Sequence, residues 1–90
     1  MLRIQVLGPS CGKCVRLESM VVEELQSLHI IDAEVEKISN SQLIERYLTD
    51  EPPGLLINGA LFWGGGTLPE REQLRAWLER AVEGGIAERH

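Results

Sequence analysis

The sequence predicts an α/β domain whose elements follow the order strand, helix, strand, helix, β-hairpin, helix. Three observations indicate this order. Apolar residues alternate with other residues in two short stretches, as is typical of strands, and recur at helical spacing in three further stretches. The dipeptide Asn58-Gly59 also stands between two apolar runs, and this is the strongest short-range signal for a two-residue hairpin turn.

The first strand is expected over residues 2–7, and the first helix follows a break at Gly8-Pro9-Ser10. Ser10 is well placed to cap a helix that begins near Cys11. We expect this helix to end at about His29, which has no catalytic or ligand role in this interpretation. The apolar stripe of the helix comprises Cys14, Leu17, Val21, Leu25 and Leu28.

The middle of the chain predicts a second strand and a short second helix. Residues 32–38 alternate and carry many charges, which suits an edge strand because charge discourages pairing with other chains. Ser39 and Gln42 have capping-box spacing, so we expect a helix of about two to three turns, with Tyr47 in the core. The two prolines Pro52-Pro53 end that helix, because neither can donate a backbone hydrogen bond.

The hairpin is expected to pair residues 55–57 with residues 60–63 around Asn58-Gly59. At least one of the aromatic residues Phe62 and Trp63 should lie in the core. The three glycines 64–66 predict a flexible exit from the hairpin.

A last helix is predicted from near Pro69, and Gly84-Gly85 should stop it. These limits give one domain over residues 1–83 and a tail over residues 84–90. The buried face of the helix comprises Leu74, Trp77, Leu78, Ala81 and Val82.

The motif Cys11-Gly12-Lys13-Cys14 is the candidate functional site, because its two cysteines stand at a strand-to-helix junction. The helical stripe turns Cys14 inward and leaves Cys11 exposed at the tip. The positive end of the helix dipole and the charge of Lys13 both lower the pKa of a thiol there. We therefore predict that Cys11 is the nucleophile and Cys14 the resolving thiol.

Composition narrows the partners and the compartment. The chain has 90 residues and a formal net charge of −5, which argues against nucleic acid or an anionic membrane as partner, because both need clustered Lys and Arg. Proteins and small thiols remain as the expected partners. No uncharged run suits a signal peptide or a membrane span, so we expect the cytoplasm, where a lone C-x-x-C is more often catalytic or metal-binding than structural.

These features together resemble the thioredoxin fold, and most closely the small thioredoxin-like proteins called redox-active disulfide proteins. The resemblance covers residues 1 to about 83. It implies a four-stranded mixed sheet flanked by three helices, and a disulfide oxidoreductase that moves electrons through the Cys11-Cys14 pair without a prosthetic cofactor. The matching stretches are residues 4–8 with 11–14, residues 31–37, residues 53–59 and Trp77-Leu78.

The same resemblance implies that Pro53 is a cis proline beside the motif. We predict that the residues supporting the active site are Ser10, Gly12, Lys13, Pro52 and Pro53. Substrates would be protein or small-molecule disulfides, and a reductase or a thiol would supply electrons.

Two residues depart from the thioredoxin pattern. Pro52 precedes the cis proline and has no N–H to offer a bound peptide, so extended peptides should bind less well and a dedicated partner is favoured. Gln5 stands where thioredoxins have a buried carboxylate that moves protons for the resolving thiol. Gln5 cannot titrate, so we expect slower resolution.

Other functions stay open at this point. A glutaredoxin-like, glutathione-coupled protein would use the glycines 64–66, although Thr67 stands where an acidic residue is expected. Two thiolates also suit Cu(I), but small copper-carrying domains end on a strand and usually have Met where Pro9 stands. A zinc site would need further ligands, and only His29 and His90 are offered. An inert cysteine pair or a non-catalytic interaction module is the remaining alternative.

Overall fold

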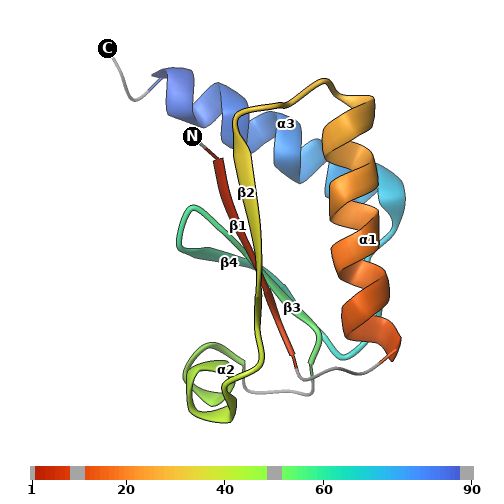
Figure 1. Ribbon diagram of the computed structural model, residues 1–90. Helices are drawn as coiled ribbons and strands as arrows, with labels where there is room; N and C mark the ends of the chain where they lie inside the picture. The colour runs from red at the N-terminus through yellow and green to blue at the C-terminus, as the bar shows by residue number, and fades with distance from the viewer. Residues whose placement is uncertain (1, 9–11, 49–51, 88–90) are drawn as a thin grey trace.

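The computed structural model describes residues 2–8, 12–48 and 52–87, with side chains described as far as Glu83. Its helices and strands follow the predicted order (Figure 1). They are β1 (Leu2–Leu7), α1 (Gly12–Ser27), β2 (Ala33–Ile38), α2 (Ser41–Tyr47), β3 (Gly54–Ile57), β4 (Ala60–Gly64) and α3 (Arg71–Ala87).

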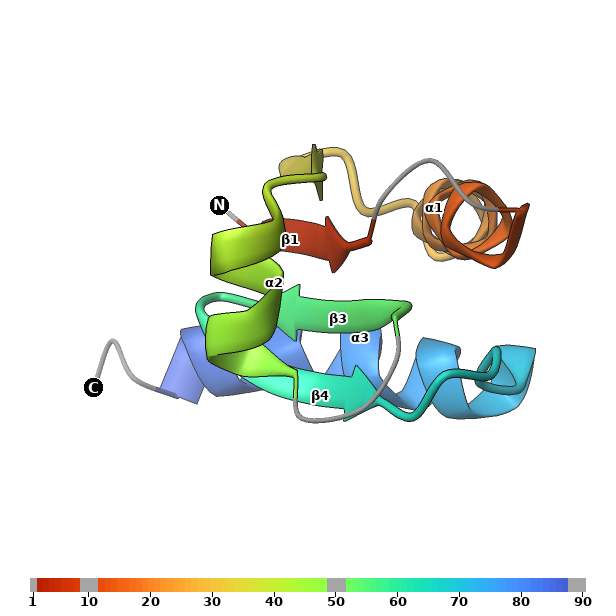
Figure 2. The same cartoon turned by 90° about the horizontal axis from the view of Figure 1, so that it is seen from below.

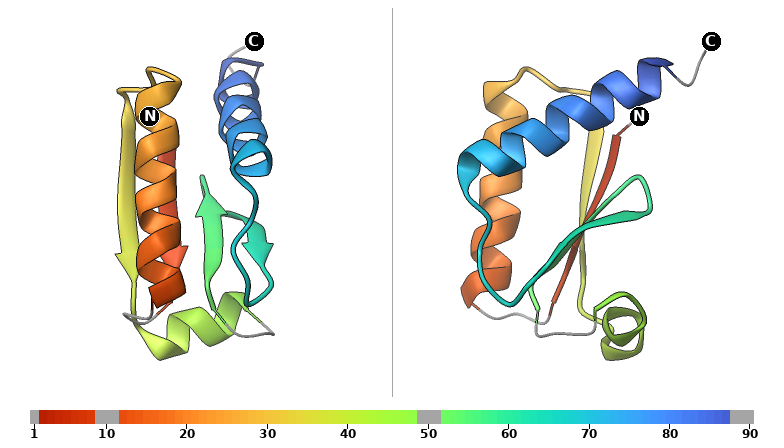
Figure 3. Two further views of the ribbon diagram at one scale, coloured as in Figure 1. Left: turned by 90° about the vertical axis from the view of Figure 1, so that its right-hand side faces the viewer. Right: turned by 180° about the vertical axis from the view of Figure 1, so that it is seen from behind.

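The four strands form one mixed sheet in the order β2-β1-β3-β4. β1 pairs parallel with β2 and antiparallel with β3, and β3 pairs antiparallel with β4. The highly charged β2 is therefore an edge strand, as predicted. α1 and α2 lie on opposite sides of the sheet (Figure 2), and α3 crosses the sheet at an angle to α1 (Figure 3).

The larger core lies between the sheet and the two helices α1 and α3. Alternate residues of β1 point into it, and the helical stripe predicted for α1 meets them there. Each fully buried aliphatic side chain stabilises the fold by about 1.5–3 kcal/mol. The buried members are Leu2, Ile4, Val6, Leu17, Met20, Val21, Leu25, Leu55, Ile57, Leu74 and Leu78.

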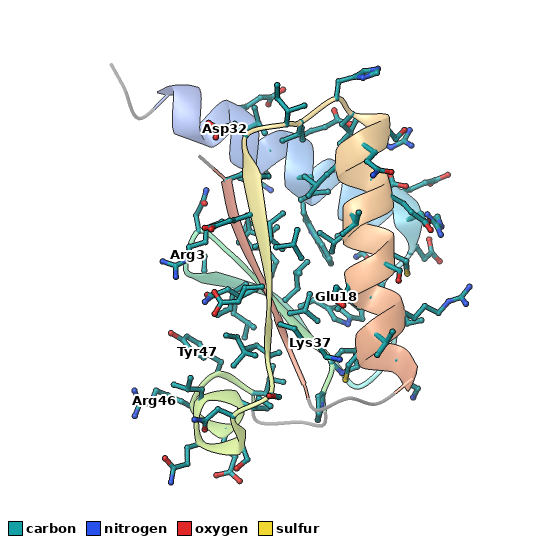
Figure 4. All side chains as sticks on the ribbon, viewed as in Figure 1. Arg3, Glu18, Asp32, Lys37, Arg46 and Tyr47 are labelled. Carbon is teal, nitrogen blue, oxygen red and sulfur yellow. The ribbon has the colours of Figure 1, made fainter. Side chains whose placement is uncertain are left out.

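A smaller core lies on the other face, under α2. It consists of Leu7, Ile44, Leu48 and Leu56. The prediction that Tyr47 belongs to the core is wrong, because its side chain is 41% exposed and extends from α2 toward solvent (Figure 4). A helix of two turns buries only the side chains one turn apart on its inner face.

The cap of α2 also differs from the prediction. Asn40, not Ser39, is the N-cap residue. Its side-chain oxygen accepts hydrogen bonds from the backbone N–H groups of Gln42, at 2.9 Å, and Leu43, at 3.4 Å. Asn and Ser serve this position about equally well, so the path of the chain out of β2 decides which residue takes it.

The two long helices end in different ways. His29 follows α1 with a φ of 57°, and backbone bonds from His29 N–H to Gln26 O and from Ile30 N–H to Leu25 O complete a Schellman motif. His29 thus ends the helix as predicted. The prediction that Gly84-Gly85 stops α3 is wrong, since the helix continues to Ala87; a glycine costs about 1 kcal/mol in a helix but still forms its backbone hydrogen bonds.

The hairpin turn has the predicted geometry. Asn58 and Gly59 both have positive φ angles, 52° and 84°, as a type I′ turn requires. The Asn58 side-chain oxygen accepts a hydrogen bond from the N–H of Arg3, and Asn58 N–H donates to Arg3 O at 2.7 Å. The turn is therefore also joined to the central strand.

A cluster of charges joins α1 to α3. Helical spacing predicts that Glu24 lies on the solvent-facing side of α1, yet its side chain is only 6% exposed. Its carboxylate accepts hydrogen bonds from Arg75 Nε at 2.9 Å and Arg71 Nη1 at 3.4 Å. Arg71 also pairs with Glu23 at 2.7 Å, and this hydrogen bond is the main cause that raises the pKa of Arg71 above its ordinary value.

Candidate functional site

Three segments meet at one end of the sheet. They are Gly8, which follows β1, the first turn of α1, and the two prolines before β3. Gly8 lies between the α1 turn and the prolines. A Cβ atom placed on Gly8 would collide with Cys14 Sγ and would lie 3.2 Å from both Cys14 Cβ and Pro52 Cβ. Real Cβ atoms rarely approach so closely, so no residue larger than glycine fits here without moving a neighbour.

Cys14 is fully buried on the inner face of α1, as its place in the helical stripe predicts. It is disulfide-bonded. Cys11 and Ser10 lie outside the described residues, so the roles predicted for them stay predictions. Gly12 is exposed and is the first residue of α1.

Pro52-Pro53 leads directly into β3. The peptide bond between the two prolines is cis, and Pro53 is fully buried whereas Pro52 is partly exposed. Gly54, the next residue, pairs with Leu7 at the end of β1. This pairing places the prolines beside Gly8, and therefore beside Cys14.

The glycine turn, residues 64–67, is more constrained than its composition indicates. The Lys13 ammonium donates a hydrogen bond to the carbonyl oxygen of Gly66 at 3.1 Å. Trp63 Nε1 donates to the carbonyl oxygen of Thr67 at 2.8 Å, and the Trp63 ring packs on Trp77 of α3 with centroids 5.8 Å apart. The glycine turn thus lies between α1 on one side and, on the other, the contact of Trp63 in β4 with Trp77 in α3.

Comparison with known proteins identifies the family. The family model of the thioredoxin domain matches residues 2–79. The chain belongs to the thioredoxin family. It is similar to a thioredoxin of Methanothermobacter thermautotrophicus, with 42% identity over 62 residues that cover 68% of this chain and 78% of that protein. It is also similar to the solved structure of a mutant thioredoxin from Halobacterium salinarum NRC-1, with a TM-score of 0.62 and 26% identity over 89% of this chain and 74% of that one.

Membership of the thioredoxin family assigns this chain to the thiol–disulfide oxidoreductases in general. The thioredoxin fold predicted from the sequence is confirmed. Family membership leaves open what two residues of this chain do, the glutamine on β1 and the proline before Pro53.

Gln5 does not lie beside Cys14 in this thioredoxin fold. Residues directly opposite each other in antiparallel strands share a face, and Gln5 lies opposite Leu56, which packs under α2. On the face that α1 covers, β1 presents Ile4 and Val6. β1 therefore offers aliphatic side chains, and no proton acceptor, to the helix that carries Cys14.

The described part of the chain holds no group of three or more His, Cys, Asp or Glu that could bind a metal ion. His29 is exposed at the far end of α1, about 22 Å along the helix from its first turn at 1.5 Å per residue. His90 lies outside the described residues. Among the helices described, none has the length and apolar character needed to cross a membrane.

Sequence reasoning did not assign a site role to Gly8, and it gave the glycines 64–66 a role only in the glutathione-coupled alternative and Trp63 a place in the core or in a docking patch. A single glycine between a strand and a C-x-x-C motif was the available signal for Gly8. The contacts of Lys13 with Gly66 and of Trp63 with Thr67 had no such signal, because a hydrogen bond across 53 residues leaves no periodic pattern in the sequence.

Proposed function

We propose that this protein exchanges thiols and disulfides through the pair Cys11 and Cys14, with Cys11 as the nucleophile. The observation that carries the proposal is the full burial of Cys14, whose sulfur lies against Gly8. A substrate disulfide cannot reach a fully buried sulfur, so the attack falls to Cys11, the other cysteine of the chain.

The reaction proceeds in two steps. The thiolate of Cys11 attacks one sulfur of the substrate disulfide, the substrate S–S bond breaks, and the leaving thiolate takes up a proton. The thiolate of Cys14 then attacks the Cys11 sulfur of the mixed disulfide, which releases the second substrate thiol and leaves the Cys11-Cys14 disulfide. Two electrons pass from the protein to the substrate.

Residues around the pair tune these steps. The charge of Lys13 and the N-terminus of α1 favour the Cys11 thiolate. No carboxylate on β1 takes the proton of Cys14, so solvent does so and resolution is slow. Pro52 offers no N–H to a bound peptide, which favours a dedicated protein partner over extended peptides in general.

The electrons come from a thiol or from a reductase, and no prosthetic cofactor takes part. The cytoplasm is the compartment that suits this reaction, because its thiol pool keeps such a pair reduced. Substrates are disulfides of proteins or of small molecules.

Single cysteine substitutions test the proposal. In Cys14→Ser, Cys11 should form a stable mixed disulfide with the substrate, visible as a mass increase of the intact protein. Cys11→Ser should form none and should have no reductase turnover. In the reduced wild-type protein, iodoacetamide should modify Cys11 before Cys14. Faster modification of Cys14 would overturn the assignment of the nucleophile.

Redox titration against glutathione and dithiothreitol then gives the direction of exchange. A two-electron transition near −270 mV, about the value of thioredoxin, supports a reductase. A value well above about −200 mV points instead to an oxidant or a glutathione-coupled protein.

A further inference from the structure

We propose that Lys13 is a positioning residue, which holds the glycine turn (residues 64–67) against the start of α1 and so fixes one wall of the redox site. This inference rests on the proposed exchange reaction and concerns its substrates. The position of the turn should affect the binding of large substrates that contact it, and not the binding of small ones. Its physical basis is the hydrogen bond from Lys13 Nζ to Gly66 O.

The contact of Lys13 with Gly66 is specific, because water alone could also solvate the Lys13 ammonium. Its side chain is exposed, so water could satisfy all three donors of the ammonium without cost. Its Nζ lies instead 3.1 Å from a backbone carbonyl that is 53 residues away in the chain. An exposed hydrogen bond of this kind contributes little to global stability, so its consequence is local: it sets where the turn lies.

The turn depends on such contacts because of its composition. Gly64, Gly65 and Gly66 have no side chains to pack, and glycine gains more backbone freedom than any other residue when it is released. The second anchor is Trp63, whose indole N–H donates to Thr67 O at 2.8 Å. Lys13 therefore holds the turn from the side of the cysteine motif, and Trp63 holds it from the side of α3.

The position of Lys13 in the chain makes this anchor part of the site. Lys13 precedes Cys14 directly, in the first turn of α1, so the anchored turn lies beside the motif. A protein substrate that brings its disulfide to the motif meets this wall, whereas a small disulfide need not. Loss of the anchor should then raise KM for a protein disulfide, whereas exchange with a small disulfide should respond only to loss of the Lys13 charge, which favours the Cys11 thiolate.

Amide hydrogen exchange tests the anchor directly. In Lys13→Met, the backbone amides of residues 65–67 should exchange about two- to tenfold faster, the factor that one net hydrogen bond supplies. Lys13→Arg should restore slow exchange, because a guanidinium can still donate to Gly66 O. Arg16→Met removes an exposed charge from the same helix and is the matched control. Equal exchange in wild type and Lys13→Met would overturn the proposal, whatever the activity of the protein.

Kinetics separate the anchor from the charge of Lys13. Insulin serves as the protein disulfide and hydroxyethyl disulfide as the small one. The assays are run at about pH 9, above the ordinary thiol pKa of about 8.5. At this pH the Cys11 thiol is mostly ionised with or without the charge of Lys13. Lys13→Met should raise KM for insulin about two- to tenfold. Trp63→Phe, which keeps the charge and removes the other anchor, should raise KM for insulin and leave turnover of the small disulfide unchanged.

An unchanged KM for insulin in both variants would show that Lys13 acts through its charge alone. Failure of the proposed function has a different signature, since the wild-type protein would then turn over neither disulfide. In that case the exchange rates of residues 65–67 still decide whether Lys13 holds the turn.

Discussion

The two faces of the sheet are covered unequally. One face carries α1 and α3 and a continuous core that reaches from β2 to β4. The other face carries α2, a helix of seven residues, over a core in which Ile44 and Leu48 supply the helical side. The remainder of that second face is exposed, and it includes the ion pair of Arg3 with Glu36 and the side chain of Leu61.

The smaller core is the one that adjoins the loops of the site. A Cβ atom on Gly54 or on Gly64 would lie 2.6 Å from Leu48 Cδ2, so the Leu48 side chain fills the space beside both glycines. Gly54 follows Pro53, and Gly64 begins the glycine turn. The comparison teaches that the larger core supplies most of the stability, whereas the smaller core positions the start of β3, next to Pro53, and the glycine turn.

The largest expected effect on stability comes from the larger core. Leu78→Ala removes a fully buried side chain and should lower the free energy of unfolding by about 2–5 kcal/mol. Urea denaturation measures this change. Turnover of the folded fraction should stay close to that of wild type, and Val22→Ala, at a 39% exposed position on α1, is the control that should change little. A loss of turnover without a loss of stability would remove the distinction between the two faces.

A smaller effect on stability, with a larger effect on the site, is expected from Leu48→Ala. The cost should be about 2–3 kcal/mol, the lower part of the range, because a short surface helix can settle into the space. KM for insulin should rise, since Gly54 and Gly64 both lose their contact with the side chain. Leu61→Ala, on the same face but 47% exposed, should alter neither quantity. If Leu48→Ala and Leu61→Ala gave the same KM for insulin, α2 would have no role in positioning the site.

The smallest effect is expected from the cap of α2. Asn40→Ala removes the acceptor for two backbone N–H groups and should cost about 1 kcal/mol. Asn40→Asp keeps an acceptor and should keep the stability. Circular dichroism during urea titration measures both variants. A full loss of 2 kcal/mol or more, about the upper limit for a cap, would mean that Asn40 does more than cap the helix.

Features that depend on nearby residues were predictable from the sequence. Asn58-Gly59 specifies its turn within two residues, and the stripe that contains Cys14 and Leu17 specifies the inner face of α1. The N-cap of α2 was missed because Ser39 and Asn40 are adjacent and chemically equivalent for this role. The end of α3 was missed because Gly84-Gly85 weakens a helix without blocking it.

Features that depend on distant residues were not predictable in this way. The burial of Glu24 follows from arginines on α3, and nothing near Glu24 in the sequence indicates them. In the site, the inward direction of Cys14 came from helical spacing, and the place of Pro53 beside the motif came from the family resemblance. The close approach of Gly8 to Cys14 and Pro52 required the folded backbone.

The central position of β1 has a consequence for synthesis. Within this sheet, β1 is synthesised before its pairing partners, residues 33–38 and 54–57, and its core contacts are completed by Leu74 and Leu78. At about 5–20 residues per second, roughly 4 to 15 seconds pass between the translation of Ile4 and that of Leu78. During that interval the apolar side of β1 has no complete cover. The earliest strand is thus among the last to be fully enclosed, and we expect chaperones that recognise exposed aliphatic segments to meet the nascent chain there.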